Sequence, residues 1–149
     1  MDVIRHPGAA IIIPLSNKNT VLLIKQFRHA IGAHIWEIPT GTLNEKEKAI
    51  ECAKRELIEE TGYSANEWHI IGEIIPLPAY SDARMHIFIA IGLVPAKQKL
   101  DKDELLEVHQ IKLEDAIDMI HKGEIQDSKT ISGLFMALHW LKQNKKNYS

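Results

Sequence analysis

Short apolar runs rich in β-branched residues recur along the chain, and each ends at glycine, proline or small polar residues. This pattern is typical of β-strands bounded by turns. The runs at 9–15 and 21–27 flank the polar segment Asn17-Lys18-Asn19, so they predict an antiparallel hairpin. Further strands are predicted at 35–39, 68–76, 85–94 and 105–113.

Three segments carry apolar residues at helical spacing instead. They predict helices at 45–60, 113–121 and 127–143. The core-facing residues of the first would be Ala49, Ile50, Ala53 and Leu57, and Gly62 would cap its end with a positive φ. The last helix would present Ile131, Leu134, Phe135, Leu138 and Leu141 on one face. Strands around one helix, with more helices at the end, predict an α+β or α/β sandwich.

Length and composition are those of an ordinary soluble protein. A chain of 149 residues, 45% hydrophobic and 26% charged, predicts one domain over 1–149 with a frayed polar tail at 143–149. The net charge of −2 argues against a nucleic-acid partner, because such surfaces are usually basic. No apolar run could span a bilayer, and Pro7-Gly8 interrupts any secretory signal, so we expect no membrane partner and a cytoplasmic location. The single cysteine, Cys52, is expected to pack rather than to act as a nucleophile.

The predicted helix at 45–60 is crowded with carboxylates. Glu56 and Glu60 lie one turn apart and Glu59 lies three residues after Glu56, so the three acids share one side. Like charges at this spacing destabilise a helix, whereas a hard divalent cation would take their oxygens together with waters and phosphates. We therefore expect a metal-loaded anion site. The alternative is a solvated acidic face. Such a face would not explain why glycine stands at both ends of the segment and arginine beside the acids.

Residues 41–63 fill the fixed positions of the Nudix box, G-x5-E-x7-R-E-U-x-E-E-x-G-U, in which U is a bulky apolar residue. Only Tyr63, at the last U, is not aliphatic. The chain thus resembles the Nudix hydrolases. The resemblance implies their α+β fold, an α/β/α sandwich in which the box helix packs on a mixed β-sheet and further helices follow at the C-terminus. It also implies attack by water on the pyrophosphate of a nucleoside diphosphate linked to another moiety.

The same resemblance implies a metal site. Glu56 and Glu60 match metal ligands, and Glu59 matches either a ligand or a water-bridging catalytic neighbour. The carbonyl of Thr40, just before the box glycine, matches a further ligand. Mg²⁺ is the expected cofactor, with Mn²⁺ as the alternative.

Two further catalytic residues follow from the resemblance. Arg55 belongs to the implied set, where we expect it to brace the loop and the helix through Glu47 rather than to touch substrate. The general base is expected in a loop outside the box, and Glu104, in the acidic run at 101–104, is the best candidate. The alternative is that this run only carries solubilising charges before a strand.

Segments around the box resemble the bacterial ADP-ribose pyrophosphatase branch of the family. They are KQFR at 25–28, WEIPTG at 36–41, PLPAYSD at 76–82 and GEIQDSKT at 123–130. This implies a small-molecule nucleotide substrate, ADP-ribose or a related ADP-sugar, hydrolysed to AMP and a sugar phosphate. Arg28, Glu37 and Tyr80 are then expected to contact the nucleotide; the alternatives are a surface arginine, a surface acid and an aromatic loop anchor.

Other functions stay open at this stage. Another nucleotide, such as a dinucleotide polyphosphate or a modified nucleoside triphosphate, could be the substrate, or the chain could be a non-catalytic nucleotide-sensing module. The intact acid set argues against the module. Longer members of the branch exchange an N-terminal strand region between subunits, and about eight residues precede the first predicted strand here. A homodimer is therefore a candidate assembly, whereas a pocket built from such an exchanged region is in question.

Overall fold

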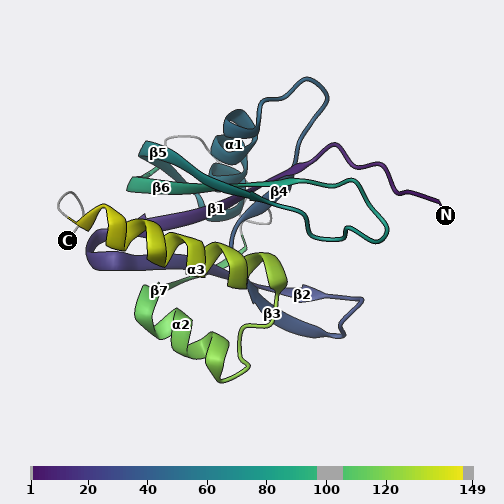
Figure 1. Cartoon of the computed structure of the whole chain (residues 1–149). Helices are drawn as coiled ribbons and strands as arrows, with labels where there is room; N and C mark the ends of the chain where they lie inside the picture. Colours follow the sequence, from purple (N-terminus) through teal and green to yellow (C-terminus); the bar gives the residue numbers. More distant parts are fainter. Residues whose placement is uncertain (1, 97–105, 146–149) are drawn as a thin grey trace.

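The computed structural model describes residues 2–96 and 106–145. Seven strands and three α-helices make up this part of the chain, and a short 3₁₀ helix, η1 (Asn17–Asn19), joins the first two strands (Figure 1). The strands are β1 (Ala9–Ser16), β2 (Thr20–Arg28), β3 (Ala33–Glu37), β4 (Thr40–Thr42), β5 (Tyr63–Ile74), β6 (Met85–Pro95) and β7 (Glu107–Lys112). The helices are α1 (Ala49–Thr61), α2 (Leu113–His121) and α3 (Ser128–Gln143).

Strand β1 lies at the centre of a mixed sheet. It runs parallel to β6 along 9–15 and antiparallel to β4 along 9–11. Its hairpin partner β2 pairs with it only beside the turn, at Leu15 and Ser16. Beyond the turn β2 pairs with β3 and β7 instead, so the two hairpin strands diverge, and α3 runs along them (Figure 1).

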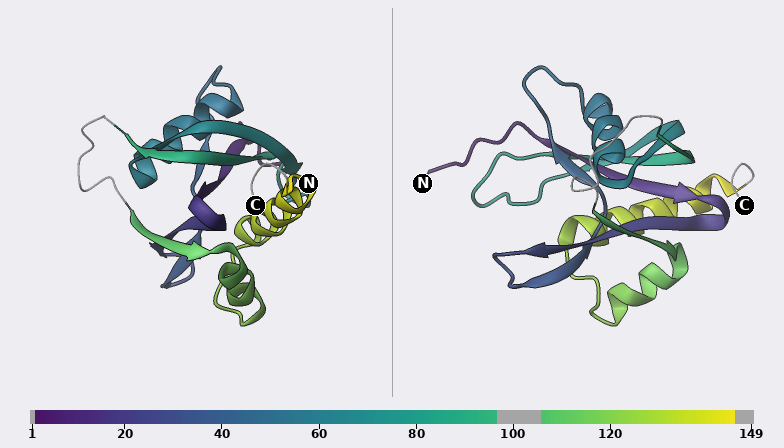
Figure 2. Two further views of the ribbon diagram at one scale, coloured as in Figure 1. Left: turned by 90° about the vertical axis from the view of Figure 1, so that its left-hand side faces the viewer. Right: turned by 180° about the vertical axis from the view of Figure 1, so that it is seen from behind.

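The side chains of β1 alternate between two cores on opposite faces of the sheet. Ile11 and Ile13 pack in a core that includes α2 and α3, whereas Ala10 and Ile12 pack against α1. Because both faces are covered, the strand is a continuous apolar run in the sequence. Helices lie on both sides of the sheet (Figure 2), which confirms the predicted α/β/α sandwich and its mixed sheet.

The predicted elements exist, but several boundaries differ and one strand, β4, was missed. Helix α1 begins at Ala49 rather than at 45, because Lys46 has a φ of 63° and Glu47 is hydrogen-bonded into a turn with Asn44. Strand β5 begins at Tyr63, directly after the α1 cap, rather than at 68. Strand β4 was not predicted, since three residues after a proline carry no recognisable alternation.

The buried faces of the helices follow the prediction except at one position. Gly62 ends α1 with a φ of 78°, as predicted, and Ala53 and Leu57 are fully buried. In α3, however, Phe135 is 39% exposed and Ala137 takes the core position instead. The helix approaches the sheet at Gly133, where an added Cβ would lie 2.8 Å from a terminal methyl of Ile13.

The remaining sequence predictions concern the chain ends and the membrane. Helix α3 continues to Gln143, which is the first residue of the predicted tail. Along the described ranges, no helix combines the length and the apolar character needed to cross a membrane. Glu104 lies outside the described residues.

Candidate active site

A cavity of about 320 Å³ collects the residues of the predicted site from widely separated segments. Its lining comprises His6, Ala9, Gln26, Arg28, Thr40, Gly41, Thr42, Glu56, Glu60, Met85 and Lys129. The start of β1, the end of β2, the whole of β4 and the second half of α1 meet here. The structure therefore brings four predicted site residues, Arg28, Thr40, Glu56 and Glu60, to one cavity.

Glu60 lines this cavity with a carboxylate that is costly to ionise. Burial and the nearby charge of Glu56 raise the pKa of Glu60 to about 8, although the backbone N–H of Thr40 donates to its Oε2 at 3.1 Å. Such a desolvated pair of carboxylates is destabilised when both are charged, and a divalent cation between them would remove that cost.

Gly41 leaves the space that the Glu56 side chain occupies. A Cβ added at Gly41 would lie 2.1 Å from both Cγ and Cδ of Glu56. Burial raises the pKa of Glu56, and the hydrogen bond from Nη1 of Arg55 to its Oε1, at 2.7 Å, opposes that rise. The glycine that begins the box motif therefore has a steric role, because any side chain at this position would displace a cavity-lining acid.

The predicted brace between Arg55 and Glu47 is confirmed. Nε and Nη2 of Arg55 donate to the two oxygens of Glu47, both at 3.0 Å, and this pairing lowers the pKa of Glu47 to about 2. Nη1 of the same guanidinium also donates to Glu59 at 3.2 Å. Arg55 thus ties the loop before α1 to the acids of the helix.

The acids do not form a uniformly solvated face, because Glu56 is shielded whereas Glu59 is half exposed. Only 14% of the Glu56 side chain is exposed, against 47% for Glu59. Glu56, Glu59 and Glu60 line one hollow together with Leu106.

The donor set has the oxygen chemistry and the negative charge that a hard divalent cation requires. Across 2–96 and 106–145, however, no three His, Cys, Asp or Glu side chains converge closely enough to hold a metal ion. Glu56 and Glu59 are instead hydrogen-bonded to Arg55, so their carboxylates point at its guanidinium. The ligand set of Glu56, Glu59, Glu60 and Thr40 therefore stays a prediction whose chemistry fits the residues present.

A second charged group closes the cavity from the side of β2, β3 and α3. Nε and Nη2 of Arg28 donate to the two oxygens of Glu37 at 2.8 and 2.9 Å, and Nζ of Lys129 donates to Oε1 of Glu37 at 2.7 Å. Burial disfavours the charge on Glu37, but these hydrogen bonds outweigh it and hold the pKa of Glu37 below its usual value. Glu37 is only 1% exposed, so its interpretation as a surface acid is wrong.

Lys129 is a basic cavity residue that the sequence reasoning missed. Its position lies in the GEIQDSKT segment, which resembles the ADP-ribose pyrophosphatase branch, and that segment was the available signal. Nothing in its own neighbours along the chain indicated that it would meet Glu37, which lies 92 positions earlier.

Tyr80 lies outside this cavity, and the structure does not describe Glu104. Tyr80 is 62% exposed, and its loop is held by its backbone, because the N–H of Ile4 donates to the carbonyl of Tyr80 at 2.7 Å. Tyr80 does not line the cavity described above, so its contact with a nucleotide stays a prediction. Glu104 is among the residues that the structure does not describe, and its role as general base also stays a prediction.

Cys52 is a packing residue, as predicted. It is fully buried in the core between α1 and the sheet. Burial raises the pKa of its thiol to about 11, which removes the thiolate that a nucleophile needs.

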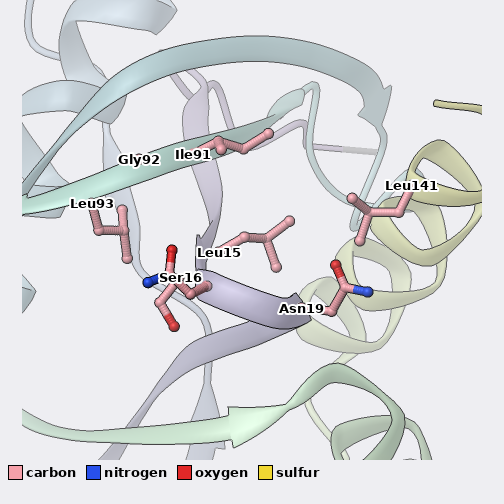
Figure 3. A pocket seen from close by; sticks show the side chains of 8 residues that line it. Leu15, Ser16, Asn19, Ile91, Gly92, Leu93 and Leu141 are labelled. Carbon is pink, nitrogen blue, oxygen red and sulfur yellow. The ribbon is translucent and has the colours of Figure 1, made fainter. Parts of the chain in front are cut away.

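Another cavity, of about 280 Å³, lies at the opposite end of β1 (Figure 3). Its lining includes Leu15, Ser16, Asn19, Gly92 and Leu141, and it contains none of the predicted site residues. None of the described charged residues of the predicted chemistry lines this second cavity.

Comparisons with known proteins agree with this geometry. The family model described as the NUDIX domain matches residues 5–134. The chain is 35% identical over 131 residues to an ADP-ribose pyrophosphatase of Bacillus subtilis (strain 168), covering 87% of this chain and 71% of that protein. It is 33% identical over 132 residues to a methanol dehydrogenase activator of Bacillus methanolicus, with 87% and 71% covered. A crystal structure of an ADP compounds hydrolase superposes with a TM-score of 0.82 at 26% identity, covering 92% of this chain and 74% of that one.

Proposed function

The chain belongs to the NUDIX family, and we propose that it hydrolyses the pyrophosphate bond of a nucleoside diphosphate linked to another moiety, with ADP-ribose or a related ADP-sugar as substrate. The single observation that carries this proposal is the cavity that Glu56 and Glu60 share with Arg28. A diphosphate ester requires acids that bind a cation and a basic side chain that binds phosphate, and both line this one cavity. Relatives named ADP-ribose pyrophosphatase and ADP compounds hydrolase support the choice of substrate.

We propose that Glu56 and Glu60, with Glu59 and the carbonyl of Thr40, hold a divalent cation, Mg²⁺ or alternatively Mn²⁺. Such an ion supplies charge neutralisation of the diphosphate when bound. The raised pKa of Glu60 supports this assignment, because a buried acid that resists ionisation gains most from a nearby positive charge.

Other residues of the chain would bind the phosphates, orient the acids and accept a proton. Arg28 would bind the phosphates, and Arg55 would keep Glu56 and Glu59 oriented through the Glu47 brace. We propose Glu104 as the base that takes the proton of the attacking water. The water oxygen forms the new bond to phosphorus, the bridging P–O bond breaks, and AMP and a sugar phosphate leave.

The test is a substrate panel with Mg²⁺ that measures released AMP and sugar phosphate for wild type and Glu60→Gln. The panel contains ADP-ribose, another nucleoside diphosphate sugar, a dinucleotide polyphosphate and a modified nucleoside triphosphate. We expect ADP-ribose among the better substrates and a loss of at least about a hundredfold in rate for the variant, the usual loss for a key electrostatic group. Near-normal turnover by Glu60→Gln would refute the metal assignment.

A second candidate is a nucleotide-sensing module without turnover. One relative is named a methanol dehydrogenase activator, a name that describes an effect on another protein, and this supports the candidate. Calorimetric titration with ADP-ribose separates the two: binding that is independent of Mg²⁺, without product, supports the module.

We also propose a homodimer in a reducing, cytoplasmic setting. The thiol of Cys52 is free, which suits a reducing compartment. Three apolar side chains on adjoining segments, Ile4, Leu77 and Tyr80, are more than half exposed, and a second copy would cover them. Sedimentation equilibrium at micromolar concentration tests the dimer, and a monomer mass would refute it.

A further inference from the structure

Glu37 holds the guanidinium of Arg28 by one edge only. The Nε–H and one Nη2–H of Arg28 point at the two oxygens of Glu37. A guanidinium has five N–H donors in one plane, so three remain, two on Nη1 and one on Nη2. No described residue accepts a hydrogen bond from Nη1 of Arg28, and 46% of the side chain is exposed. Arg28 can therefore receive a phosphate on its free edge while Glu37 fixes the plane of the group.

Lys129 fixes the carboxylate that fixes Arg28. Its Nζ shares Oε1 of Glu37 with Nη2 of Arg28. It also donates to both oxygens of Asp127 at 3.0 Å, and Asp127 is the N-cap of α3. The carboxylate of Glu37 is thus held between Arg28, at the end of β2, and Lys129, in the first turn of α3.

The first turn of α3 is itself tied to the strand beside the cavity. Thr130 is fully buried; its N–H donates to Oδ2 of Asp127 at 3.2 Å, and its Oγ1 accepts the N–H of Ile38 at 3.2 Å. Ile38 directly follows Glu37 in the chain. The helix start and the strand end are therefore joined by this hydrogen bond and by the pair of Lys129 with Glu37.

Lys129 is poorly placed to bind phosphate on its own account. Only 15% of its side chain is exposed, and its ammonium already faces two carboxylates, those of Glu37 and Asp127. Its charge is neutralised locally, whereas Arg28 has a single carboxylate partner and a free edge. The two cations that line the cavity thus have different roles.

We propose that Lys129 is a positioning residue: it locks the carboxylate of Glu37 so that Arg28 presents its free guanidinium edge to the diphosphate of the substrate. The role at the substrate rests on the proposed function. The orientation of Arg28 does not, because every contact that sets it lies within the protein.

The test is a double-mutant cycle with Arg28→Met, Lys129→Met and the double variant, assayed for kcat and KM on ADP-ribose. Because Arg28 would hold substrate and transition state alike, we expect Lys129→Met to raise KM about tenfold with kcat within about twofold. In the Arg28→Met background the same substitution should change KM by less than about twofold. Lys129→Arg, which can still donate to Glu37, should recover most of the loss. Lys142→Met, in the exposed last turn of α3, is the matched control and should match wild type.

A full, multiplicative effect of Lys129→Met in the Arg28→Met background would overturn the proposal, because Lys129 would then act independently of Arg28. An unchanged KM for Lys129→Met would overturn it as well.

An NMR measurement without substrate separates this proposal from the proposed function. The Arg28 Nε–H signal, assigned by its absence in Arg28→Met, should be resolved in wild type and Lys129→Arg and broadened in Lys129→Met. An unchanged signal in a folded Lys129→Met protein refutes the positioning role. If the wild-type protein hydrolyses no diphosphate ester but Lys129→Met still shows this broadening, the proposed function is refuted and the positioning of Arg28 by Lys129 is supported.

Discussion

Replacing Gly41 by alanine should inactivate the site without unfolding the protein. The added Cβ would lie 2.1 Å from Cγ and Cδ of Glu56 and 2.3 Å from its Oε1. Carbon atoms in contact lie about 3.5–4.0 Å apart, so the Glu56 side chain has to move by more than about 1 Å. Gly41 is not among the positive-φ positions, so its backbone suits alanine.

The displacement of Glu56 in Gly41→Ala should lower the rate of catalysis rather than the stability of the fold. A misplacement of about 1 Å at a reacting site can cost about a hundredfold, which corresponds to about 2.7 kcal/mol in transition-state stabilisation. Stability should change little, because alanine reduces the entropy of the unfolded chain by about 0.4–1 kcal/mol and so offsets the strain. We therefore expect kcat/KM to fall about a hundredfold while the thermal midpoint stays within a few degrees.

Steady-state kinetics on ADP-ribose and a thermal melt measure the two quantities. Gly123→Ala is the control, because it has a φ of 78° and open space around its Cβ; it should lose stability to backbone strain and keep its activity. Glu56→Gln in the Gly41→Ala background should cost little more, since the side chain is already displaced. Normal kcat/KM in a folded Gly41→Ala protein would show that Glu56 need not occupy its place beside Gly41.

Three further predictions concern stability and reactivity. Gly133→Ala should lower the free energy of unfolding by about 1–3 kcal/mol in urea, because the new Cβ would lie 2.8 and 2.9 Å from methyls of Ile13 and Ile38; an unchanged midpoint would mean that α3 can shift freely. The pKa of Glu47 is lowered to about 2, so the stability that it adds is present above the unfolded value of 4.5 and is lost as pH falls towards 2. The difference in thermal midpoint between wild type and Glu47→Gln should therefore be constant above about pH 5 and shrink below it. A difference that grows in acid would contradict the lowered pKa of Glu47. Cys52 should react with a disulfide reagent only on unfolding, and rapid labelling of the folded protein would contradict its burial.

Local sequence patterns determined the elements and the chemical type of the site. The apolar run at 9–15, the helical spacing in 113–121 and 127–143 and the capping Gly62 were readable because each depends on neighbours only a few residues away. The box motif located the acids for the same reason. Its glycines, its arginine and its carboxylates occupy one short strand, the loop after it and one helix, so their order along the chain reflects their contacts.

Tertiary structure decided which distant residues meet and which side chains are buried. From the sequence, Glu37 could be either a substrate contact or a surface acid. The packing of α3 on the sheet encloses it between Arg28 and Lys129. The contact between Arg55 and Glu47 likewise joins the helix to the loop before it, and tertiary packing decides it. Burial and long-range pairing follow from how strands and helices pack, and a linear pattern of apolar and polar residues does not contain that information.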